Sequence, residues 1–396
     1  SAGGGGGRSF IAGYDEFNGR LLWQWFSVPP SGGDPEWDFK DAAKGNINPY
    51  PGDWGENDLI GGGSIFSLVA VDESTGIIYF PTGAPALAYD ASLRPGPNLY
   101  SNSIVALDAN TGKMIWYHQT TPHDINGHEP ARSLILANAT INGEERKVIL
   151  SSTKGDYAYV LDAATGELLH NPISFGAQKI SAYNTNQGNN ADMNLSQDVL
   201  EGNEYCPGAF GGAASTSAFA DDTFFVASQN YCSKFNAGQI PYKEKLINGF
   251  RIEPSLAGQS STVHAIDVST GQIKWTFPIE SRYQGGITVS GGVVYLVDIS
   301  GNFYALDSET GDVLKKIPMN GAGNTGVTIA SDANGDMRLF VATGGSKSGI
   351  ITALGLPEES TADNDGISRR GIIGSIALTS IVGILYLAFL RFYKKN

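Results

Sequence analysis

The stretch "IVALDANTGKMIWYH", Ile104 to His118, decides the fold. Apolar residues alternate with other residues on both sides of a central Asp-x-x-Thr-Gly, and a period of two is typical of strands. The side chain of Asp108 can cap a tight turn, and Gly112 can supply the positive φ that such a turn needs. The stretch therefore predicts a strand, a turn and a second strand.

The same pattern returns along the chain. The other copies are "IAGYDEFNGRLLWQW" from Ile11, "LVAVDESTGIIYF" from Leu68, "YVLDAATGELLH" from Tyr159, "VHAIDVSTGQIKWTF" from Val263 and "FYALDSETGDVLKKI" from Phe303. Further strand candidates, such as "DTFFVASQNY" and "GGVVYLVDISGN", lie between the copies. Repeats of about 40 to 55 residues built from strands alone predict an all-β protein of the β-propeller type. Two long polar stretches, Pro29–Asn57 and Asn171–Gly202, are interpreted as loops inserted between strands.

Composition agrees with many short strands and tight turns. The 396 residues include 51 glycines, with 10% aromatic and 17% charged residues. The net charge of −14 repels phosphate backbones, so we expect no nucleic-acid partner. Two cysteines, Cys206 and Cys232, are compatible with free thiols or with one disulfide.

The C-terminal region predicts a membrane anchor. Gly371–Leu390 carries no charge and, as a helix, would span about 30 Å, the thickness of a bilayer core. Basic residues flank it at both ends: Arg369, Arg370, Arg391, Lys394 and Lys395. The predicted organisation is a propeller over 1–355, an acidic flexible linker over 356–370, a transmembrane helix over 371–390 and a short basic cytoplasmic tail over 391–396.

This organisation predicts a single-pass protein of the cell membrane with its large domain outside the cytoplasm. Asn138 and Asn194 lie in Asn-x-Ser/Thr triplets and are predicted glycosylation sites. The chain opens on "SAGGGGGRSF", which is no hydrophobic export signal, so we expect a mature form or a C-terminal piece of a longer precursor.

Several stretches in combination carry a resemblance to a known family. They are "RSFIAGYDEFNGRLLWQW", "GGGSIFSLVAVDESTGIIYFPTGAP", "LDANTGKMIWYHQTTPHD", "KGDYAYVLDAATG", "CPGAFGG" and "GGITVSGGVVYLVDISGNFYALDSETG". Over roughly Ser1 to Gly345 the chain resembles the quinoprotein alcohol and methanol dehydrogenases, which use pyrroloquinoline quinone (PQQ). The resemblance implies an eight-bladed propeller with the quinone on its central axis. About two or more N-terminal blades of the family pattern have no counterpart here, so we expect an incomplete propeller whose open strand edges are covered by other protein subunits. A ring that closes with fewer blades, and a sequence that is a piece of a longer chain, stay open as alternatives.

The resemblance also implies a site that this chain has altered. In the family a Ca²⁺ or lanthanide ion polarises the quinone while an aspartate takes the proton of the alcohol. A glutamate ligand is expected where this chain has Gly4, an asparagine ligand where it has Ala84, and the aspartate where it has Gly127. Because glycine and alanine carry no ligand atom, no metal ligand is predicted with confidence. Glu129, two residues beyond Gly127, is the candidate acid.

Three further features follow from the resemblance. Lys154 matches the cation that bonds the quinone, although a solvated turn lysine is the competing interpretation. Phe66 stands where a stacking tryptophan is expected, which makes it a weak cofactor contact. Cys206 and Cys232 match a cysteine pair of the family, and this match predicts a disulfide between them.

The remaining polar residues of "PHDINGHE" favour a structural role. Asp124 is interpreted as a hydrogen-bonding aspartate near a turn, and His123 and His128 as turn or core residues. A metal pair of His128 and Glu129 stays open, although neighbouring residues of a strand point to opposite faces.

Three hypotheses about function follow. The favoured one is a membrane-anchored propeller that has lost quinone and metal and serves as a scaffold, binding module or subunit of a membrane complex. The alternative is an active PQQ-dependent alcohol dehydrogenase, with Ca²⁺ or a lanthanide, that uses Glu129 and Lys154 and passes electrons to a membrane carrier. A carbohydrate- or polymer-binding propeller that uses exposed Trp37 and Trp54 is the third, although packing of these rings over the blade surface is the competing interpretation.

Overall fold

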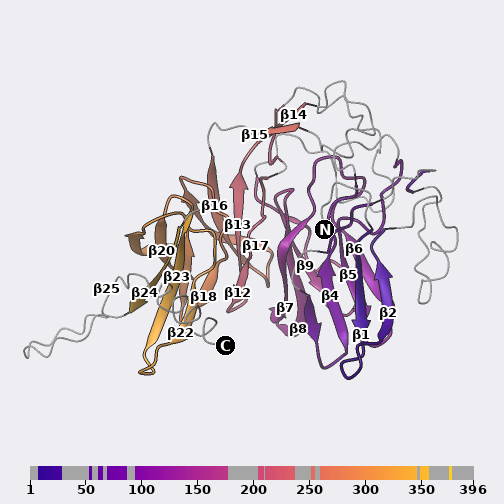
Figure 1. The fold of residues 1–396 in the computed structure, drawn as a ribbon, viewed down its shortest axis with the longest axis horizontal. Coiled ribbons are helices and arrows are strands. Elements are labelled where there is room, and N and C mark those ends of the chain that lie inside the picture. Colours follow the sequence, from indigo (N-terminus) through magenta and orange to yellow (C-terminus); the bar gives the residue numbers. More distant parts are fainter. Residues whose placement is uncertain are drawn as a thin grey trace, which may run out of the picture. The chain divides into compact units, whose positions relative to one another are not determined.

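The chain is almost entirely antiparallel β-structure in the part that the structure describes (Figure 1). The computed structural model describes residues 8–28, 53–55, 61–65, 69–86, 94–176, 204–208, 210–236, 251–254, 259–345, 348–355 and 374–376. These residues contain strands and no helix, as the sequence predicts. They fall into two compact units, Ser1–Arg282 and Tyr283–Asn396.

The first unit contains three four-stranded sheets. The first sheet contains, in order, β3 (Ala70–Asp72), β4 (Ile77–Pro81), β5 (Ser103–Asp108) and β6 (Met114–Gln119). The second contains β7 (Pro130–Ile141), β8 (Glu144–Thr153), β9 (Tyr157–Asp162) and β10 (Ile173–Ser174). The third contains β12 (Ala218–Ala220), β13 (Thr223–Asn230), β16 (Ser260–Asp267) and β17 (Gln272–Ile279). Two smaller sheets accompany them: β1 (Phe10–Tyr14) with β2 (Leu21–Phe26), and β11 (Glu204–Tyr205), β14 (Ser233–Asn236) and β15 (Arg251–Pro254).

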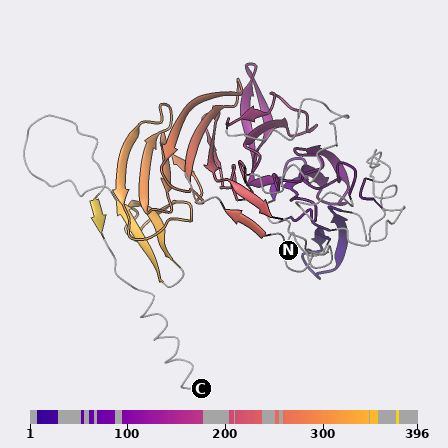
Figure 2. The same cartoon turned by 90° about the horizontal axis from the view of Figure 1, so that it is seen from above.

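The second unit contains two neighbouring four-stranded sheets (Figure 2). They are β18 (Thr288–Ser290), β19 (Val293–Val297), β20 (Asn302–Asp307) and β21 (Val313–Pro318), and β22 (Thr328–Ser331), β23 (Met337–Gly345), β24 (Ser348–Gly355) and β25 (Gly374–Ile376). Phe303 of the first sheet and Val341 of the second belong to one buried apolar cluster. Burial of facing apolar side chains therefore joins the two sheets.

The repeated Asp-x-x-Thr/Asn-Gly segments form turns between paired strands, as predicted. In the copy that opens the sequence analysis, Asp108 Oδ1 accepts the backbone N–H groups of Asn110 at 2.9 Å and Thr111 at 2.8 Å. The glycine of every copy has a positive φ, which costs glycine nothing and other residues about 1 kcal/mol or more. These glycines are Gly19, Gly76, Gly112, Gly166, Gly271 and Gly311.

Side chains that follow these turns join each sheet of the first unit to the next. Trp23 Nε1 donates to the carbonyl of Ala109 at 2.9 Å, and Trp116 Nε1 donates to the carbonyl of Ala163 at 3.0 Å. In the copy that begins at Tyr159 the tryptophan is replaced by His170, whose Nε2 lies 2.7 Å from the carbonyl oxygen of Val268. Each ring packs on a turn glycine that leaves no room for a Cβ: Gly112, Gly166 and Gly271.

One expectation about the long inserted stretches changes. Ile173 and Ser174 form β10 and pair with Ala158 and Tyr157, so the insertion expected from Asn171 begins after this strand. Ile173 is buried in the core shared with β13, and this apolar contact explains the strand. Most of Pro29–Asn57 and of the later insertion lies outside the described residues.

The predicted transmembrane range is described over Gly374–Ile376 alone, and there it is strand β25, paired with Ala353–Gly355 of β24. Backbone pairing with the open side of β24 accounts for the strand at these three residues, where the sequence predicts helix. Within the described part of the chain, no helix has the length and apolar character needed to cross a membrane. The rest of 371–390, the linker and the tail lie outside it, so the anchor stays a prediction.

Candidate functional site

Glu129 and Lys154 are brought together by the register of β7 and β8. Pro130, the first residue of β7, pairs with Thr153, the last residue of β8, so the residues just beyond them face each other. The backbone N–H of Lys154 donates to the carbonyl of Glu129 at 3.1 Å. Lys154 Nζ lies 2.9 Å from Glu129 Oε1, and the two side chains are 16% and 14% exposed. Lys154 is therefore mostly buried and paired, which excludes the interpretation that it is a solvated turn lysine.

Asp124 holds the turn that leads to Glu129. Its Oδ1 accepts the backbone N–H groups of Asn126 at 2.8 Å and Gly127 at 3.0 Å. Its Oδ2 accepts the N–H of His128 and Asn102 Nδ2, at 2.8 Å and 2.7 Å. Because four donors occupy the carboxylate, Asp124 is a structural residue, as predicted.

A buried polar network behind Asp124 was missed by sequence reasoning. Arg94 donates to Asn98 Oδ1 and to the carbonyl of Asp124, both at 2.6 Å. Asp53 accepts the backbone N–H groups of Asn98 and Leu99. The network ties the "PHD" turn to two loops distant in sequence. Its members lie in irregular segments without periodicity, so no sequence signal marks them.

The two histidines of "PHDINGHE" bond to separate backbone carbonyls. His123 Nδ1 lies 2.8 Å from the oxygen of Gly96, and His128 Nε2 lies 3.0 Å from the oxygen of Pro207. Burial lowers the pKa of each, so both rings are neutral at pH 7. The structural interpretation of both residues is confirmed. His128 and Glu129 have separate partners here, so the described contacts give no support to a metal pair.

The predicted disulfide is present and borders the site. Cys206 and Cys232 are bonded, next to the pairing of β11 with β14. A loop of this length is stabilised by about 3 kcal/mol in the chain-entropy model. Gly212, beyond Cys206, packs against the backbone of Lys154, and Ala213 N donates to the carbonyl of Thr153 at 3.2 Å. The segment therefore fixes the turn that carries Lys154.

The positions where the resemblance expects metal ligands carry no ligand side chain. Ala84 follows β4, and its carbonyl accepts the N–H of Gly63 at 2.9 Å. Gly127 is buried with φ of 72°, a conformation that an aspartate would adopt only with strain. Gly4 and Phe66 lie outside the described residues. Among the residues that are described, no three His, Cys, Asp or Glu side chains gather where they could hold a metal.

Two surface predictions have different outcomes. Asn138, on β7, is exposed, which is what glycosylation requires, while Asn194 lies outside the described residues. Trp54 is buried, and its Nε1 donates to the carbonyl of Leu99 at 2.8 Å. Of the two interpretations of Trp54, the packed ring is confirmed and the exposed polymer-binding ring is not, because the ring packs over the loop before β5. Trp37 lies outside the described residues.

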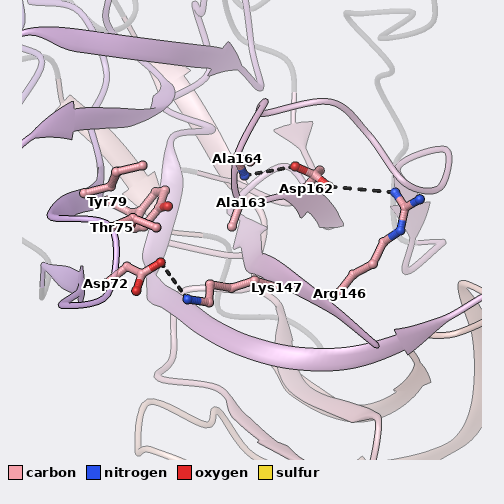
Figure 3. A pocket seen from close by; sticks show the side chains of 9 residues that line it. Asp72, Thr75, Tyr79, Arg146, Lys147, Asp162, Ala163 and Ala164 are labelled. Atoms are coloured by element: carbon pink, nitrogen blue, oxygen red, sulfur yellow. Dashed lines mark hydrogen bonds and ion pairs between the residues drawn. The ribbon is translucent and has the colours of Figure 1, made fainter. Parts of the chain in front are cut away.

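A pocket of about 280 Å³ lies between the β3–β4 turn and the β8–β9 sheet (Figure 3). Its lining includes Tyr79 and two oppositely charged pairs. Lys147 Nζ lies 2.7 Å from Asp72 Oδ2, and Arg146 lies 3.8 Å from Asp162. Lys147 of β8 is paired with Asp72 of β3 in the next sheet, and Arg146 of β8 is paired with Asp162 of β9 in its own sheet. Because both cations are paired with carboxylates, the pocket is best explained as the contact region between two sheets.

Comparison with known proteins places the chain among quinoprotein relatives. Residues 5–174 match the family model "Glucose/ethanol/alcohol dehydrogenase, beta-propeller domain", and residues 259–354 match "Outer membrane protein assembly factor BamB". The chain is 28% identical to the putative dehydrogenase XoxF of Paracoccus denitrificans over 86% of its length and 59% of the relative. It is 27% identical to the lanthanide-dependent methanol dehydrogenase of Methylorubrum extorquens, over 94% of the chain and 65% of the relative. With the quinohemoprotein alcohol dehydrogenase of Comamonas testosteroni it shares 30% identity, over 82% of the chain and 48% of the relative.

Solved structures agree on the fold. Quinohemoprotein alcohol dehydrogenase ADHIIG of Pseudomonas putida HK5 matches with a TM-score of 0.73 at 22% identity, over 88% of this chain and 54% of that one. A europium-containing methanol dehydrogenase matches with a TM-score of 0.66 at 21% identity, over 87% of this chain and 62% of that one. The chain thus spans about half to two thirds of these relatives. The repeats, the all-β sheets and these similarities support membership of the family of PQQ-dependent alcohol and methanol dehydrogenases.

Proposed function

We propose that the chain is an oxidoreductase of the quinoprotein class that oxidises an alcohol, with Glu129 and Lys154 as its working residues. The observation that carries the proposal is the ion pair of these two residues, 2.9 Å apart and mostly buried. The relatives named above support it, because they are dehydrogenases. The favoured hypothesis from sequence, a propeller that has lost quinone and metal and serves as a scaffold, binding module or subunit, draws no support from these relatives.

Each residue has a role that its chemistry allows. PQQ, when bound, supplies the acceptor for the hydride that leaves the alcohol carbon. The Lys154 ammonium has three N–H groups, of which the bond to Glu129 uses one, so it can also donate to an oxygen of the quinone. The Glu129 carboxylate can accept the hydroxyl proton of an alcohol placed beside it. Lys154 would hold the Glu129 carboxylate in position through its charge-assisted hydrogen bond.

The described residues do not fit a Ca²⁺ or lanthanide ion. Such hard cations need about six to eight oxygen ligands, several of them carboxylate or amide. Ala84 and Gly127 offer no side-chain oxygen, and the oxygens of Asp124 already accept four N–H groups. We therefore assign no step of the reaction to a metal.

Activity assays on single variants test the proposal. The full chain is incubated with PQQ, and dye reduction by short alcohols is followed with and without Ca²⁺ or lanthanide. Glu129→Gln is expected to lower kcat/KM by about 10²–10⁴, because it removes the base. Lys154→Ala is expected to weaken quinone binding. Glu144→Gln, an exposed carboxylate at the start of β8, is the matched control and is expected to change neither. Activity that survives Glu129→Gln unchanged contradicts the assigned role.

A second candidate is a non-catalytic scaffold, binding module or subunit of a membrane complex. The specific observation in its favour is the absence of side-chain oxygens at Ala84 and Gly127. A scaffold would keep its stability and its partners in Glu129→Gln and Lys154→Ala. Co-purification of the same partner subunits with wild-type and variant chains, without quinone, supports this candidate.

We also propose a single-pass membrane location with the propeller outside the cytoplasm. The uncharged Gly371–Leu390 range supports it, as does the disulfide, because disulfides persist in oxidising compartments. The exposed Asn138 triplet is compatible with it. Protease treatment of intact cells is expected to degrade the propeller, and deletion of Gly371–Asn396 is expected to release it. Full protection of the propeller contradicts the orientation.

A further inference from the structure

Asp156 is a buried acid that the proposed reaction does not use. It ends the three-residue turn from Lys154 that joins β8 to β9, with φ of 63°. Its backbone N–H donates to the carbonyl of Thr153 at 3.1 Å, and its carbonyl accepts the N–H of Phe175 at 3.0 Å. Its side chain is 0% exposed, and in the described part of the chain neither carboxylate oxygen has a hydrogen-bond partner of good geometry.

The surroundings of Asp156 are apolar or neutral. Burial raises its pKa to about 7, and hydrogen bonding with Ser228 of β13 opposes this shift. Phe175, bonded to the Asp156 backbone, stacks on His264 of β16 with ring centroids 4.4 Å apart. Burial lowers the pKa of His264 to about 4, so this ring is neutral and offers no positive charge.

The remaining titratable groups near the turn do not neutralise Asp156. On the turn itself, Lys154 is paired with Glu129. The ring of His128 packs against Gly155, and burial holds the pKa of His128 below its ordinary value. Tyr157, the next residue, has a phenol side chain and supplies no cationic group.

An ionised carboxylate in this place would cost several kcal/mol unless something compensated it. A hard cation is a poor solution, because it would need about six oxygens, whereas the described neighbours offer hydroxyls and one carboxylate. A proton removes the charge without any further ligand, and the Ser228 hydroxyl is a hydrogen-bonding neighbour for the neutral group. Protonation is therefore the least costly state of Asp156 in the folded protein.

We propose that Asp156 is a pH-sensitive device built into the fold: the neutral side chain is accommodated in its buried place, and its ionisation loosens the turn that presents Lys154. A negative charge between the two sheets is relieved most simply when the turn moves towards solvent. Because Lys154 is two residues away in the same turn, this movement disturbs its pairing with Glu129. The inference rests on burial and packing and does not depend on the proposed reaction.

The sign of the effect follows from linkage. The pKa of Asp156 is higher in the folded chain than in the unfolded chain, so the stability that protonation supports is complete below about pH 4. This stability is lost as pH rises towards about 7 and does not fall further above it. Between pH 5 and pH 8 this one group raises the unfolding equilibrium constant by about 100-fold.

Denaturant unfolding of the full chain between pH 5 and pH 9 tests the device. Relative to the wild type, Asp156→Asn is expected to remove the 100-fold change and to be the more stable protein at pH 8. Glu144→Gln, exposed on the same sheet, is the control and should follow the wild-type profile. Parallel pH profiles for wild type and Asp156→Asn would overturn the proposal.

Two measurements on the wild type keep the test decisive if Asp156→Asn does not fold. Infrared difference spectra should show a protonated carboxyl band that disappears as pH passes about 7. Hydrogen exchange of the peptide containing 153–157, corrected for intrinsic rate, should become faster over the same range. A missing carboxyl band, or exchange that does not change, contradicts the device.

Discussion

The ion pair of Glu129 and Lys154 makes a quantitative prediction about coupling. At an effective dielectric constant of about 20, opposite unit charges 4 Å apart attract by about 4 kcal/mol, and desolvation offsets much of this attraction. Exposed pairs retain about 0–1 kcal/mol, whereas breaking a buried pair costs about 3–5 kcal/mol. The two side chains are 14% and 16% exposed with 2.9 Å between charged atoms, so we expect a coupling of about 1–3 kcal/mol.

A double-mutant cycle measures this coupling directly. Glu129→Gln, Lys154→Met and the double variant are unfolded in urea, and the non-additive part of the change in unfolding free energy is the coupling. The control cycle uses Arg146 and Glu144, which lie 3.8 Å apart and are 44% and 75% exposed. The control is expected to give less than about 0.5 kcal/mol. Equal coupling in the two cycles would refute the claim that the site holds a built, desolvated pair.

Two further predictions concern the contacts between sheets. Trp116→Phe keeps an aromatic ring but leaves the carbonyl of Ala163 unpaired, so it should destabilise the chain by about 1–3 kcal/mol in urea unfolding. Ile115→Ala, 43% exposed on the same strand, should cost far less, and equal losses would contradict the role of the indole N–H. The hydrogen bond from Lys147 lowers the pKa of Asp72, so Asp72 supports stability above about pH 4 and loses this contribution as pH falls. Lys147→Met should therefore have a lower unfolding free energy than wild type at pH 6, and the difference between the two proteins should be smaller near pH 2. A difference in unfolding free energy that does not change with pH contradicts the stabilising role of the Lys147–Asp72 pair.

The repeats could be predicted from sequence because their physics is local. Asp108 and Gly112 lie within one turn, and capping and positive φ depend on neighbours a few residues away. Glu129 and Lys154 were candidates only through the family resemblance, and the register of β7 and β8 shows that they meet. Sequence alone had left two interpretations of Lys154 open, a quinone contact and a solvated turn lysine.

The errors and omissions come from contacts that are distant in sequence. Trp54 is buried because its indole reaches Leu99, and nothing in the surrounding polar stretch predicts that contact. Asp53 and Arg94 lie in loops and are joined through Asn98, so no periodicity marks them. Asp156 resembles any turn aspartate in sequence, and only packing against the sheet of β13 and β16 shows that it is unusual.

Bound quinone is the most direct test of the central claim. The full chain is purified from its native membrane in mild detergent, and its ultraviolet–visible spectrum and metal content are measured on one sample. The account predicts stoichiometric PQQ that is reduced when alcohol is added in wild type and is not reduced in Glu129→Gln. A protein without quinone, which remains inactive after PQQ is supplied, would contradict the account and favour a scaffold with Glu129 and Lys154 as a structural pair.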